Sequence, residues 1–264
     1  MGAYLSNYDF LRLYQELQLG IVFDELFNLD FAVVSYSKTN DSYYWNGSLT
    51  NQPLNDAQIV LVEKKFSSLH RRPSFYFEDL PGMSKFASKL KSKNYTKEYV
   101  DNWLFWDGGE ISNRHFDTVK KVADKKELDV FLRTFDKCYQ ADDPQNPYGE
   151  QSGYLPSAKV PWLENNASGK VEYFIVYDGK EVVAVSSLTN LNGIGYISNV
   201  GSLRSVRGQG YGKAATLYCV NTSINHGNNL HCLATEEGHY PNDFYSRNGF
   251  SCRFKAVGYV KSYT

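Results

Sequence analysis

The sequence predicts a mixed α/β fold, in which one sheet combines antiparallel and parallel strands. Two turn dipeptides, Asp178-Gly179 and Asn192-Gly193, separate alternating apolar runs, which is a strong short-range signal for β-hairpins. A glycine-rich loop then leads into a helix-like run and a further apolar run, the pattern of a βαβ crossover. A similar order of elements occurs in the first half of the chain. These observations favour two related α/β halves.

In the first half, helices and strands are predicted to alternate. Asn55 is a suitable N-cap for the helix that follows it, because its side chain can accept a hydrogen bond from the first turn. The expected helices are 8–17, 55–69 and 83–93, and the expected strands are 31–36, 43–49, 74–77 and 102–106.

The second half begins with an alternating strand and a capped helix. Asp124 followed by Glu127 is the start signal of a helix whose apolar face carries Leu128, Phe131 and Phe135. A polar loop with several prolines is expected next, over 140–158. The remaining expected strands are 116–122, 171–177, 181–189, 194–203, 229–235 and a final pair from 250 to about 263; the helices are 124–139, 211–225 and 242–247.

Residues 43–106 and 194–264 share the order strand–helix–strand–helix–strand, which suggests a degenerate internal duplication. The sequences at the ends of the copies also look alike, since 90–95 reads LKSKNY and 245–250 reads YSRNGF. Asp107-Gly108-Gly109 is a natural linker between them. We therefore expect an accessory α/β domain at 1–110 and a second domain at 111–264.

Composition narrows the class of protein. The chain has 264 residues, 42% of them hydrophobic, and a net charge of −1, which argues against nucleic-acid binding through bulk charge. No apolar run is long enough for a membrane span, and no secretory signal is visible. The four cysteines form no Cys-x-x-Cys pair, so we expect buried free thiols and a cytoplasmic location.

The loop Val206–Gly212 is the strongest functional signal in the chain. Gly208-x-Gly210-x-Gly212 lies between a strand and a helix, where free amide groups and the helix dipole attract a phosphate. The spacing differs from the dinucleotide fingerprint and from the P-loop. A tight turn without a ligand is the alternative.

Arg207–Gly212 matches the Gln/Arg-x-x-Gly-x-Gly/Ala signature of the GNAT superfamily of acyl-CoA N-acyltransferases. Residues 116–264 resemble that family, and Tyr245-x-x-x-Gly249-Phe250 follows at the right distance. The resemblance implies a GNAT-like C-terminal half, a degenerate GNAT-like N-terminal half, and acetyl-CoA (coenzyme A) as cofactor. It also implies that the strand before the loop splays from its parallel neighbour and pairs with the pantetheine arm. The implied cofactor-binding residues are Val200, Gly201, Leu203, Arg207, Gly208, Gln209, Gly210, Tyr211, Gly212 and Lys213.

Acyl transfer to an amine sets the remaining requirements. An alkyl amine titrates near ~10, so a base or a water chain must remove its proton. A backbone amide around Asn199 can stabilise the oxyanion, and by resemblance Tyr245 is the acid for the leaving thiolate. Many relatives carry a glutamate on the strand before the loop, and this chain does not. Glu236, its neighbour Glu237, or a water held by Ser198 or Asn199 are the candidate bases.

The acceptor site is expected around the 140–158 loop. Asp142 and Asp143 would suit a cationic amine, while Ser198 and His239 could also contact the substrate. Loop acids are often only solvated, and that alternative stays open. The histidines lack metal-ligand spacing, so no metal is predicted.

The leading hypothesis is an N-acetyltransferase that moves an acetyl group from acetyl-CoA to a primary amine of a small molecule by direct attack. The alternatives are a protein or peptide amine as acceptor, or a non-catalytic acyl-CoA-binding or interaction module. We expect no nucleic-acid or membrane partner, and the sequence is compatible with a monomer or a dimer. The first copy lacks the glycines, which predicts one cofactor site per chain.

Overall fold

The computed structural model describes residues 5–262, which divide into two compact units. Unit 1 contains the chain up to Trp103 together with the segment from Arg253 onward, and unit 2 is Leu104–Cys252. The units are therefore not two consecutive segments that meet at 110/111. The last strand of each predicted repeat, β5 (Tyr95–Trp106) and β11 (Phe250–Lys261), runs from one unit into the other.

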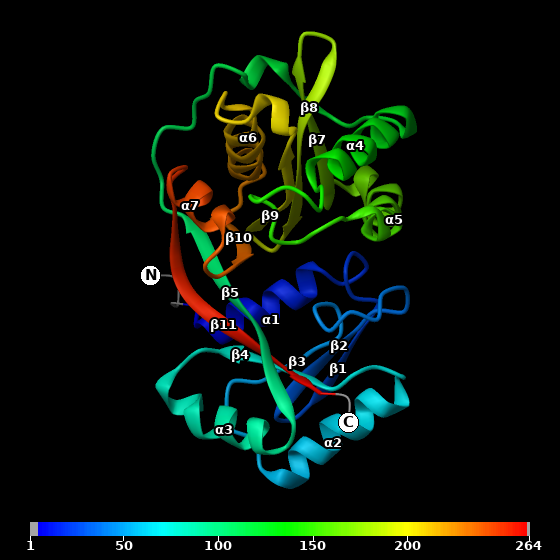
Figure 1. Ribbon diagram of the computed structural model, residues 1–264, viewed down its shortest axis with the longest axis vertical. Helices are drawn as coiled ribbons and strands as arrows, with labels where there is room; N and C mark the ends of the chain where they lie inside the picture. The colour runs from blue at the N-terminus through cyan, green and yellow to red at the C-terminus, as the bar shows by residue number, and fades with distance from the viewer. Residues whose placement is uncertain (1–4, 263–264) are drawn as a thin grey trace. The chain divides into compact units, whose positions relative to one another are not determined.

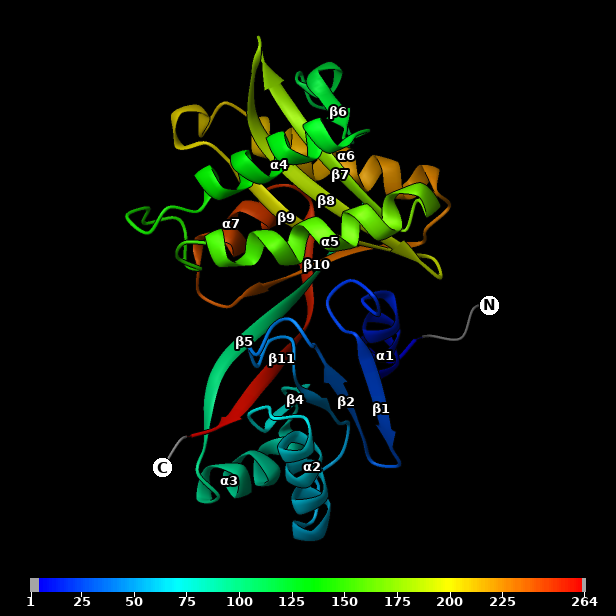
Figure 2. The ribbon, with the colours of Figure 1, turned by 90° about the vertical axis from the view of Figure 1, so that its right-hand side faces the viewer.

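Unit 2 is a mixed sheet with helices on both faces (Figures 1 and 2). The meander predicted from the two turn dipeptides is confirmed, because β7, β8 and β9 pair antiparallel in sequence and β6 adds to β7. β10 pairs parallel with β9, as a βαβ crossover requires. Helices α4 and α5 cover one face and α6 covers the other (Figure 2). The elements are β6 (Val119–Lys121), α4 (Lys125–Cys138), α5 (Leu155–Asn165), β7 (Val171–Asp178), β8 (Glu181–Leu191), β9 (Ile194–Ser202), α6 (Tyr211–Asn225), β10 (Leu230–Glu236) and α7 (Tyr240–Ser246).

Unit 1 has the same kind of sheet with shorter strands. β1, β2 and β3 pair antiparallel, β3 pairs parallel with β4, and β11 pairs antiparallel with β4. The predicted cap of α2 is confirmed as a full capping box between Asn55 and Gln58. The elements are α1 (Asn7–Leu17), β1 (Glu25–Leu29), β2 (Ala32–Tyr36), β3 (Ser48–Leu49), α2 (Asp56–Ser68), β4 (Ser74–Glu78) and α3 (Ser84–Ser92). Short 3₁₀ turns in the two units are Pro81–Met83, Phe116–Thr118, Ser152–Tyr154, Asn166–Ser168 and Arg204–Val206.

The repeated element order is present in the structure. β3–α2–β4–α3–β5 and β9–α6–β10–α7–β11 follow the same sequence, and the first two strands of each set are parallel. Each unit has its own apolar core, around Phe66 and Phe75 in unit 1 and around Phe174 and Leu217 in unit 2.

Several sequence expectations were wrong or incomplete. Part of the predicted 140–158 loop belongs to α5, in which Pro156 occupies the first turn, where its missing N–H costs nothing. The predicted strand 43–49 is reduced to Ser48–Leu49, because the Asn46 side chain binds the Asn40 and Ser42 carbonyls and holds a turn. β1 was not predicted, and the predicted strand 116–122 is shortened to β6 behind a 3₁₀ turn.

The expected final strand pair is one strand, β11. Gly258 lies within this strand and allows close packing, since a Cβ there would lie 2.1 Å from the Tyr99 ring. Tyr263, where the pair was expected to end, lies outside the described residues.

Candidate active site

The site of interest in unit 2 lies where β9 and β10 separate. The register between them runs from Ile194↔Leu230 to Tyr196↔Cys232, yet both strands continue beyond it, to Ser202 and Glu236. A cavity of about 540 Å³ lies at this place, lined by both strands, the glycine loop, α7 and the segment after α4. This volume is in the range of small-molecule and cofactor sites.

A β-bulge changes the direction of β9 inside the cavity. Opposite β8, the register shifts between Val185↔Gly201 and Ser187↔Ser198, and Asn199 has a positive φ of 52°. Asparagine tolerates this conformation better than most residues. Bulges re-aim backbone and side-chain groups next to active sites. Asn199 and Val200 thus lie outside the regular pairing of β9 with β8, at a place where both residues line the cavity.

Two tyrosines from the segments after α4 hold the bulge in place. The Tyr139 hydroxyl donates to the Val200 carbonyl at 2.8 Å, and the Tyr154 hydroxyl donates to Asn199 Oδ1 at 3.2 Å. Gly201 allows α4 to approach, because a Cβ there would lie 2.7 Å from Cys138 Cβ. Burial raises the pKa of the Cys138 thiol to about 12, so this cysteine is not a thiolate nucleophile at neutral pH.

The glycine loop presents the start of α6 to the cavity. Gly208 and Gly210 have φ values of +76° and +96°, which only glycine adopts without strain. Gly210 is the N-cap and offers no side chain, and the first bond of the helix runs from Ala214 N to Gly210 O at 2.9 Å. The amides of Tyr211, Gly212 and Lys213 precede that bond, so they are oriented toward a ligand at the helix N-terminus.

The outer side of the loop is tied down by residues 113–115. Asn113 Nδ2 donates to Gly210 O at 3.2 Å, and Arg114 donates to Gln209 O at 3.0 Å. The His115 ring stacks on Tyr211 with centroids 3.9 Å apart. These contacts hold the loop conformation before any ligand binds.

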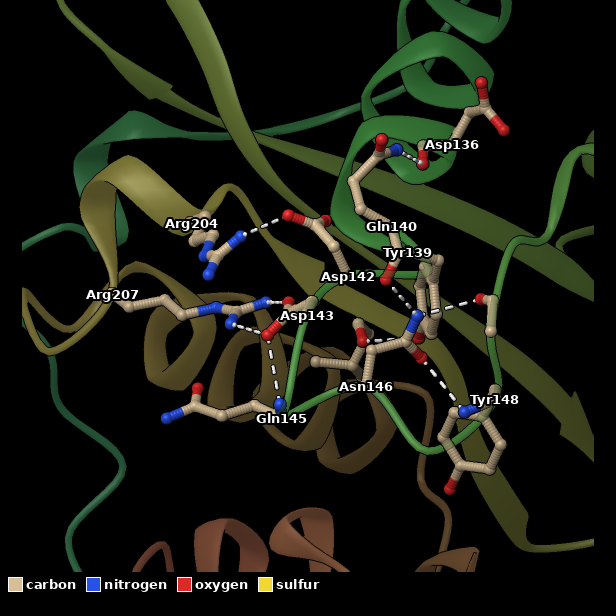
Figure 3. A network of polar contacts seen from close by, with 12 residues as sticks. Asp136, Tyr139, Gln140, Asp142, Asp143, Gln145, Asn146, Tyr148, Arg204 and Arg207 are labelled. Atoms are coloured by element: carbon tan, nitrogen blue, oxygen red, sulfur yellow. Dashed lines mark hydrogen bonds and ion pairs between the residues drawn. The ribbon is translucent and has the colours of Figure 1, made fainter.

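Arg207 is paired with Asp143, which was not expected. Its guanidinium forms a bidentate pair with Asp143, while Arg204 binds Asp142 at 3.0 Å (Figure 3). The Asp143 side chain is only 2% exposed, and the guanidinium holds its pKa below the ordinary value. The pairs join the glycine loop to the segment that carries Tyr139 and Tyr148.

Tyr245 lies on α7 at the wall of the cavity. It is half-buried and packs edge-on against Phe244 and Phe250, with centroids 5.0 and 5.8 Å away. Burial raises the pKa of its phenol, and Tyr148 contributes to the shift. Tyr245 is therefore protonated at neutral pH and can act as a proton donor.

Most of the predicted site residues converge on this cavity. Those that line it are Ser198, Asn199, Val200, Gly201, Arg207, Gly208, Gly210, Tyr211, Gly212, Lys213 and Tyr245. Predicted residues that are not part of the lining are Leu203, Gln209, Glu236, Asp142, Asp143 and His239.

Each of these outlying residues has its own partner or packing. Glu236 and His239 face one another at 4.0 Å, and Gln209 donates to the Ser205 carbonyl. Leu203 packs against the core formed by Val176 and Tyr211. Both acids expected to attract a cationic amine, Asp142 and Asp143, are paired with arginines instead of lying in the cavity wall.

The sequence reasoning missed several lining residues, among them Tyr139, Tyr148, Thr235 and Arg247. The 140–158 loop was expected to contribute to the acceptor site through its acids, and Tyr148 within it was not singled out. Its contact with β10, a hydrogen bond at 3.0 Å between the Tyr148 hydroxyl and Thr235 Oγ1, joins residues far apart in sequence. No spacing pattern could have indicated it.

The corresponding loop in unit 1, after β3, borders little space. Thr50 and Asn51, the end of β4, and Leu80 and Met83 enclose only about 30 Å³, which Tyr8 and Leu11 of α1 also line. A separate cavity of about 320 Å³ lies beside the start of α3 and β11, and the 50–51 loop is not part of its lining. Three of the four cysteines are buried free thiols, whereas Cys252 is exposed, contrary to expectation. No helix within 5–262 is long and apolar enough to cross a membrane, and no group of metal-ligand type gathers among these residues.

Comparison with known proteins identifies the fold. Residues 131–250 match the acetyltransferase (GNAT) family. The chain is similar to a conserved protein of unknown function from Staphylococcus epidermidis, at 13% identity and a TM-score of 0.69, with 92% of this chain and 96% of that chain covered. It is similar to a GCN5-related N-acetyltransferase from Kribbella flavida, at 18% identity, a TM-score of 0.65, and 96% and 95% coverage.

A tandem GNAT protein from the clavulanic acid biosynthesis pathway is also similar, at 11% identity and a TM-score of 0.53, with 88% of this chain and 79% of that chain covered. No curated protein matches the sequence. At these identities the solved structures support the fold.

Proposed function

We infer that this chain, whose residues 131–250 form an acyltransferase domain of the GNAT family, transfers an acetyl group from acetyl-CoA to a primary amine of a small molecule. The observation that carries the proposal is the cavity between the separated ends of β9 and β10. This cavity brings together the backbone amides at the start of α6, the bulged backbone of β9 and the protonated phenol of Tyr245.

The glycine loop is proposed to hold the pyrophosphate of the acyl donor. The amides of Tyr211, Gly212 and Lys213 lie at the N-terminus of α6, where the helix dipole favours negative charge. Arg207, Lys213 and Arg247 line the same cavity and add positive charge. Asp143 neutralises part of the Arg207 charge, so the backbone amides are the main anion-binding groups.

The bulged part of β9 is proposed to hold the pantetheine arm and to stabilise the oxyanion. A strand that has left its neighbour has backbone groups available for an extended ligand. The Val200 carbonyl already accepts a hydrogen bond from the Tyr139 hydroxyl. The amides between Asn199 and Gly201 are therefore the candidate oxyanion donors. Acetyl-CoA supplies an activated thioester, and the fixed amides would favour the charge that develops on its carbonyl oxygen.

Tyr245 is proposed to protonate the leaving thiolate. Its raised pKa keeps the phenol protonated, and its place on the cavity wall brings it to the reacting end of the cavity. Glu236 is a weaker candidate for the base than expected, because its carboxylate faces His239 outside the cavity lining. A water molecule that is held by Ser198 or a neighbouring hydroxyl, and that accepts the proton, agrees better with the residues that line the cavity.

Two alternatives stay open. A non-catalytic acyl-CoA-binding module would use the same glycine loop, but the retained Tyr245 favours an enzyme. A protein or peptide amine could replace the small molecule as acceptor. A cytoplasmic location is a prediction that agrees with the three buried free thiols.

Thiol release from acetyl-CoA tests the proposal directly. Purified protein is incubated with acetyl-CoA and with 2-phenylethylamine, spermidine or an alanyl dipeptide in turn, which represent aromatic, aliphatic and peptide amines. We expect at least one amine to raise thiol release above the hydrolysis background. Tight binding of acetyl-CoA without turnover across such amines would favour the binding module instead.

A further inference from the structure

The hydroxyl pair of Thr235 and Tyr148 connects the buried wall of the cavity with the surface. Thr235 lies on β10 beyond the point where β9 and β10 separate, lines the cavity, and is only 3% exposed. Its hydroxyl is 3.0 Å from the Tyr148 hydroxyl, and either oxygen can be the donor. Tyr148 is 41% exposed. A proton that reaches Thr235 therefore has an adjacent hydroxyl, on a partly exposed residue, to which it can pass.

The segment around Tyr148 is held rigidly enough to keep this pair aligned. Asn146 accepts a bond from Tyr148 N and donates to the carbonyls of Gln140 and Gly149 (Figure 3). Gln151 Nε2 donates to Tyr148 O at 2.8 Å. The bidentate pair between Asp143 and Arg207 fixes the other end of the segment. A relay needs such preorganisation, because proton transfer depends steeply on alignment.

The other hydroxyl groups at the cavity are less suited to carry a proton away. Tyr139 donates to the fixed Val200 carbonyl, so its proton is committed. Ser198 is paired with Ser187 at 2.8 Å, but Ser187 is buried and leads away from the surface. The Thr235–Tyr148 pair joins a buried lining residue to an exposed one with a hydroxyl group on each side.

We propose that Thr235 and Tyr148 form the proton exit for the acceptor amine, a role that rests on the proposed acetyl transfer. The amine nitrogen forms a bond to the carbonyl carbon, and the carbon–sulfur bond breaks. The nitrogen gives its surplus proton to Thr235 Oγ1, Thr235 passes its own proton to Tyr148, and Tyr148 passes one to water. Tyr245 protonates the thiolate and is reprotonated from solvent. Protons balance, and no other reactant is needed.

The relay is tested with Thr235→Val, Tyr148→Phe and the double variant, using acetyl-CoA and the amine that gives the highest thiol release. Each single substitution should lower kcat about tenfold, below the 10²–10⁴ that a full acid–base catalyst contributes, and leave KM for acetyl-CoA unchanged. The double variant should lose no more than either single one, because both substitutions interrupt the same route. Thr235→Ser, which keeps the hydroxyl, should retain activity.

Chemical rescue separates proton transfer from simple packing. Imidazole should raise the turnover of Thr235→Val and Tyr148→Phe in proportion to its concentration and leave the wild type unchanged. Tyr218→Phe, a substitution of the same kind in the core of unit 2, is the control and should behave as wild type. Melting temperatures establish that each variant folds.

Three results overturn the relay: wild-type turnover in either single variant, losses that multiply in the double variant, or a loss that imidazole does not relieve. If these occur while the wild type acetylates the amine, the proposed function stands and the relay alone fails. If no amine reacts with the wild type, both fail.

Discussion

Arg207 and Asp143 form a bidentate ion pair that joins the glycine loop to the segment following α4. The aspartate is almost fully buried and the arginine side chain is 23% exposed, so water screens the pair only partly. The pair contributes to the fold and to the geometry of the cavity at the same time. Arg204 and Asp142 form a parallel contact nearby, with the aspartate side chain 77% exposed. These two pairs provide a matched comparison.

Asp143→Asn should destabilise the protein by ~2 kcal/mol, because it leaves the Arg207 charge without its buried partner. Asp142→Asn removes an exposed partner and should cost less than ~0.5 kcal/mol. Urea unfolding of both variants at pH 7 measures the difference. Equal stability of the two variants would contradict a structural role for the buried pair.

The pH dependence of the same pair follows from the lowered pKa of Asp143. A carboxyl group whose pKa is lower in the folded state stabilises that state above its unfolded pKa of about 3.9. The stabilisation is lost as the pH falls through the folded value. The advantage of wild type over Asp143→Asn should therefore be complete at pH 6 and shrink below about pH 4. Unfolding at several pH values tests this, and an advantage that grows on acidification would contradict it.

Gly210→Ala should weaken acetyl-CoA binding severalfold or more. At position 210 the φ of +96° would strain a residue with a Cβ by about 1–2 kcal/mol. The backbone would shift to relieve that strain, and the amides of the loop would move with it. Gly179→Ala is the control, because Gly179 has a φ of +59° at the β7–β8 turn, away from the cavity. Both variants should lose similar stability, and only Gly210→Ala should lose affinity in calorimetric titration with acetyl-CoA. Equal affinities would remove the loop from the binding site.

Tyr245→Phe should lower kcat at least tenfold and leave acetyl-CoA affinity unchanged. The ring keeps its contacts with Phe244 and Phe250, so the change removes only the acidic hydroxyl. The raised pKa of Tyr245 has a further consequence for the pH–rate profile, since the phenol stays protonated well above neutrality. A fall in wild-type kcat between pH 7 and 9 that disappears in Tyr245→Phe would contradict this.

Each chain should bind one acetyl-CoA. The loop after β3 in unit 1, which corresponds to the glycine loop, lines only about 30 Å³ of space, whereas ligand sites usually need 300 Å³ or more. The cavity of about 320 Å³ in unit 1 does not include that loop in its lining. Calorimetric titration with acetyl-CoA should give a stoichiometry of one per chain. A second site of similar affinity would show that unit 1 also binds the donor.

Local signals in the sequence were sufficient wherever neighbouring residues decide the structure. Asn55 and Asp124 start helices because their side chains cap amides three residues later. Asp178-Gly179 and Asn192-Gly193 make the turns of the meander because Gly179, Asn192 and Gly193 adopt a positive φ. The same local logic failed at Pro156, because a proline in the first turn of a helix resembles a loop signal.

The sequence by itself determined the fold class, the glycine loop at the start of α6, and the aromatic residue four positions before Gly249. Each depends on backbone conformation or spacing within a few residues. Only the tertiary structure decided that β5 and β11 run between the units, that Arg207 pairs with Asp143, and that Tyr148 meets Thr235. Arg207 and Asp143 are 64 positions apart in the sequence, and Tyr148 and Thr235 are 87 positions apart. These contacts depend on how the strands and helices pack, which no local pattern in the chain encodes.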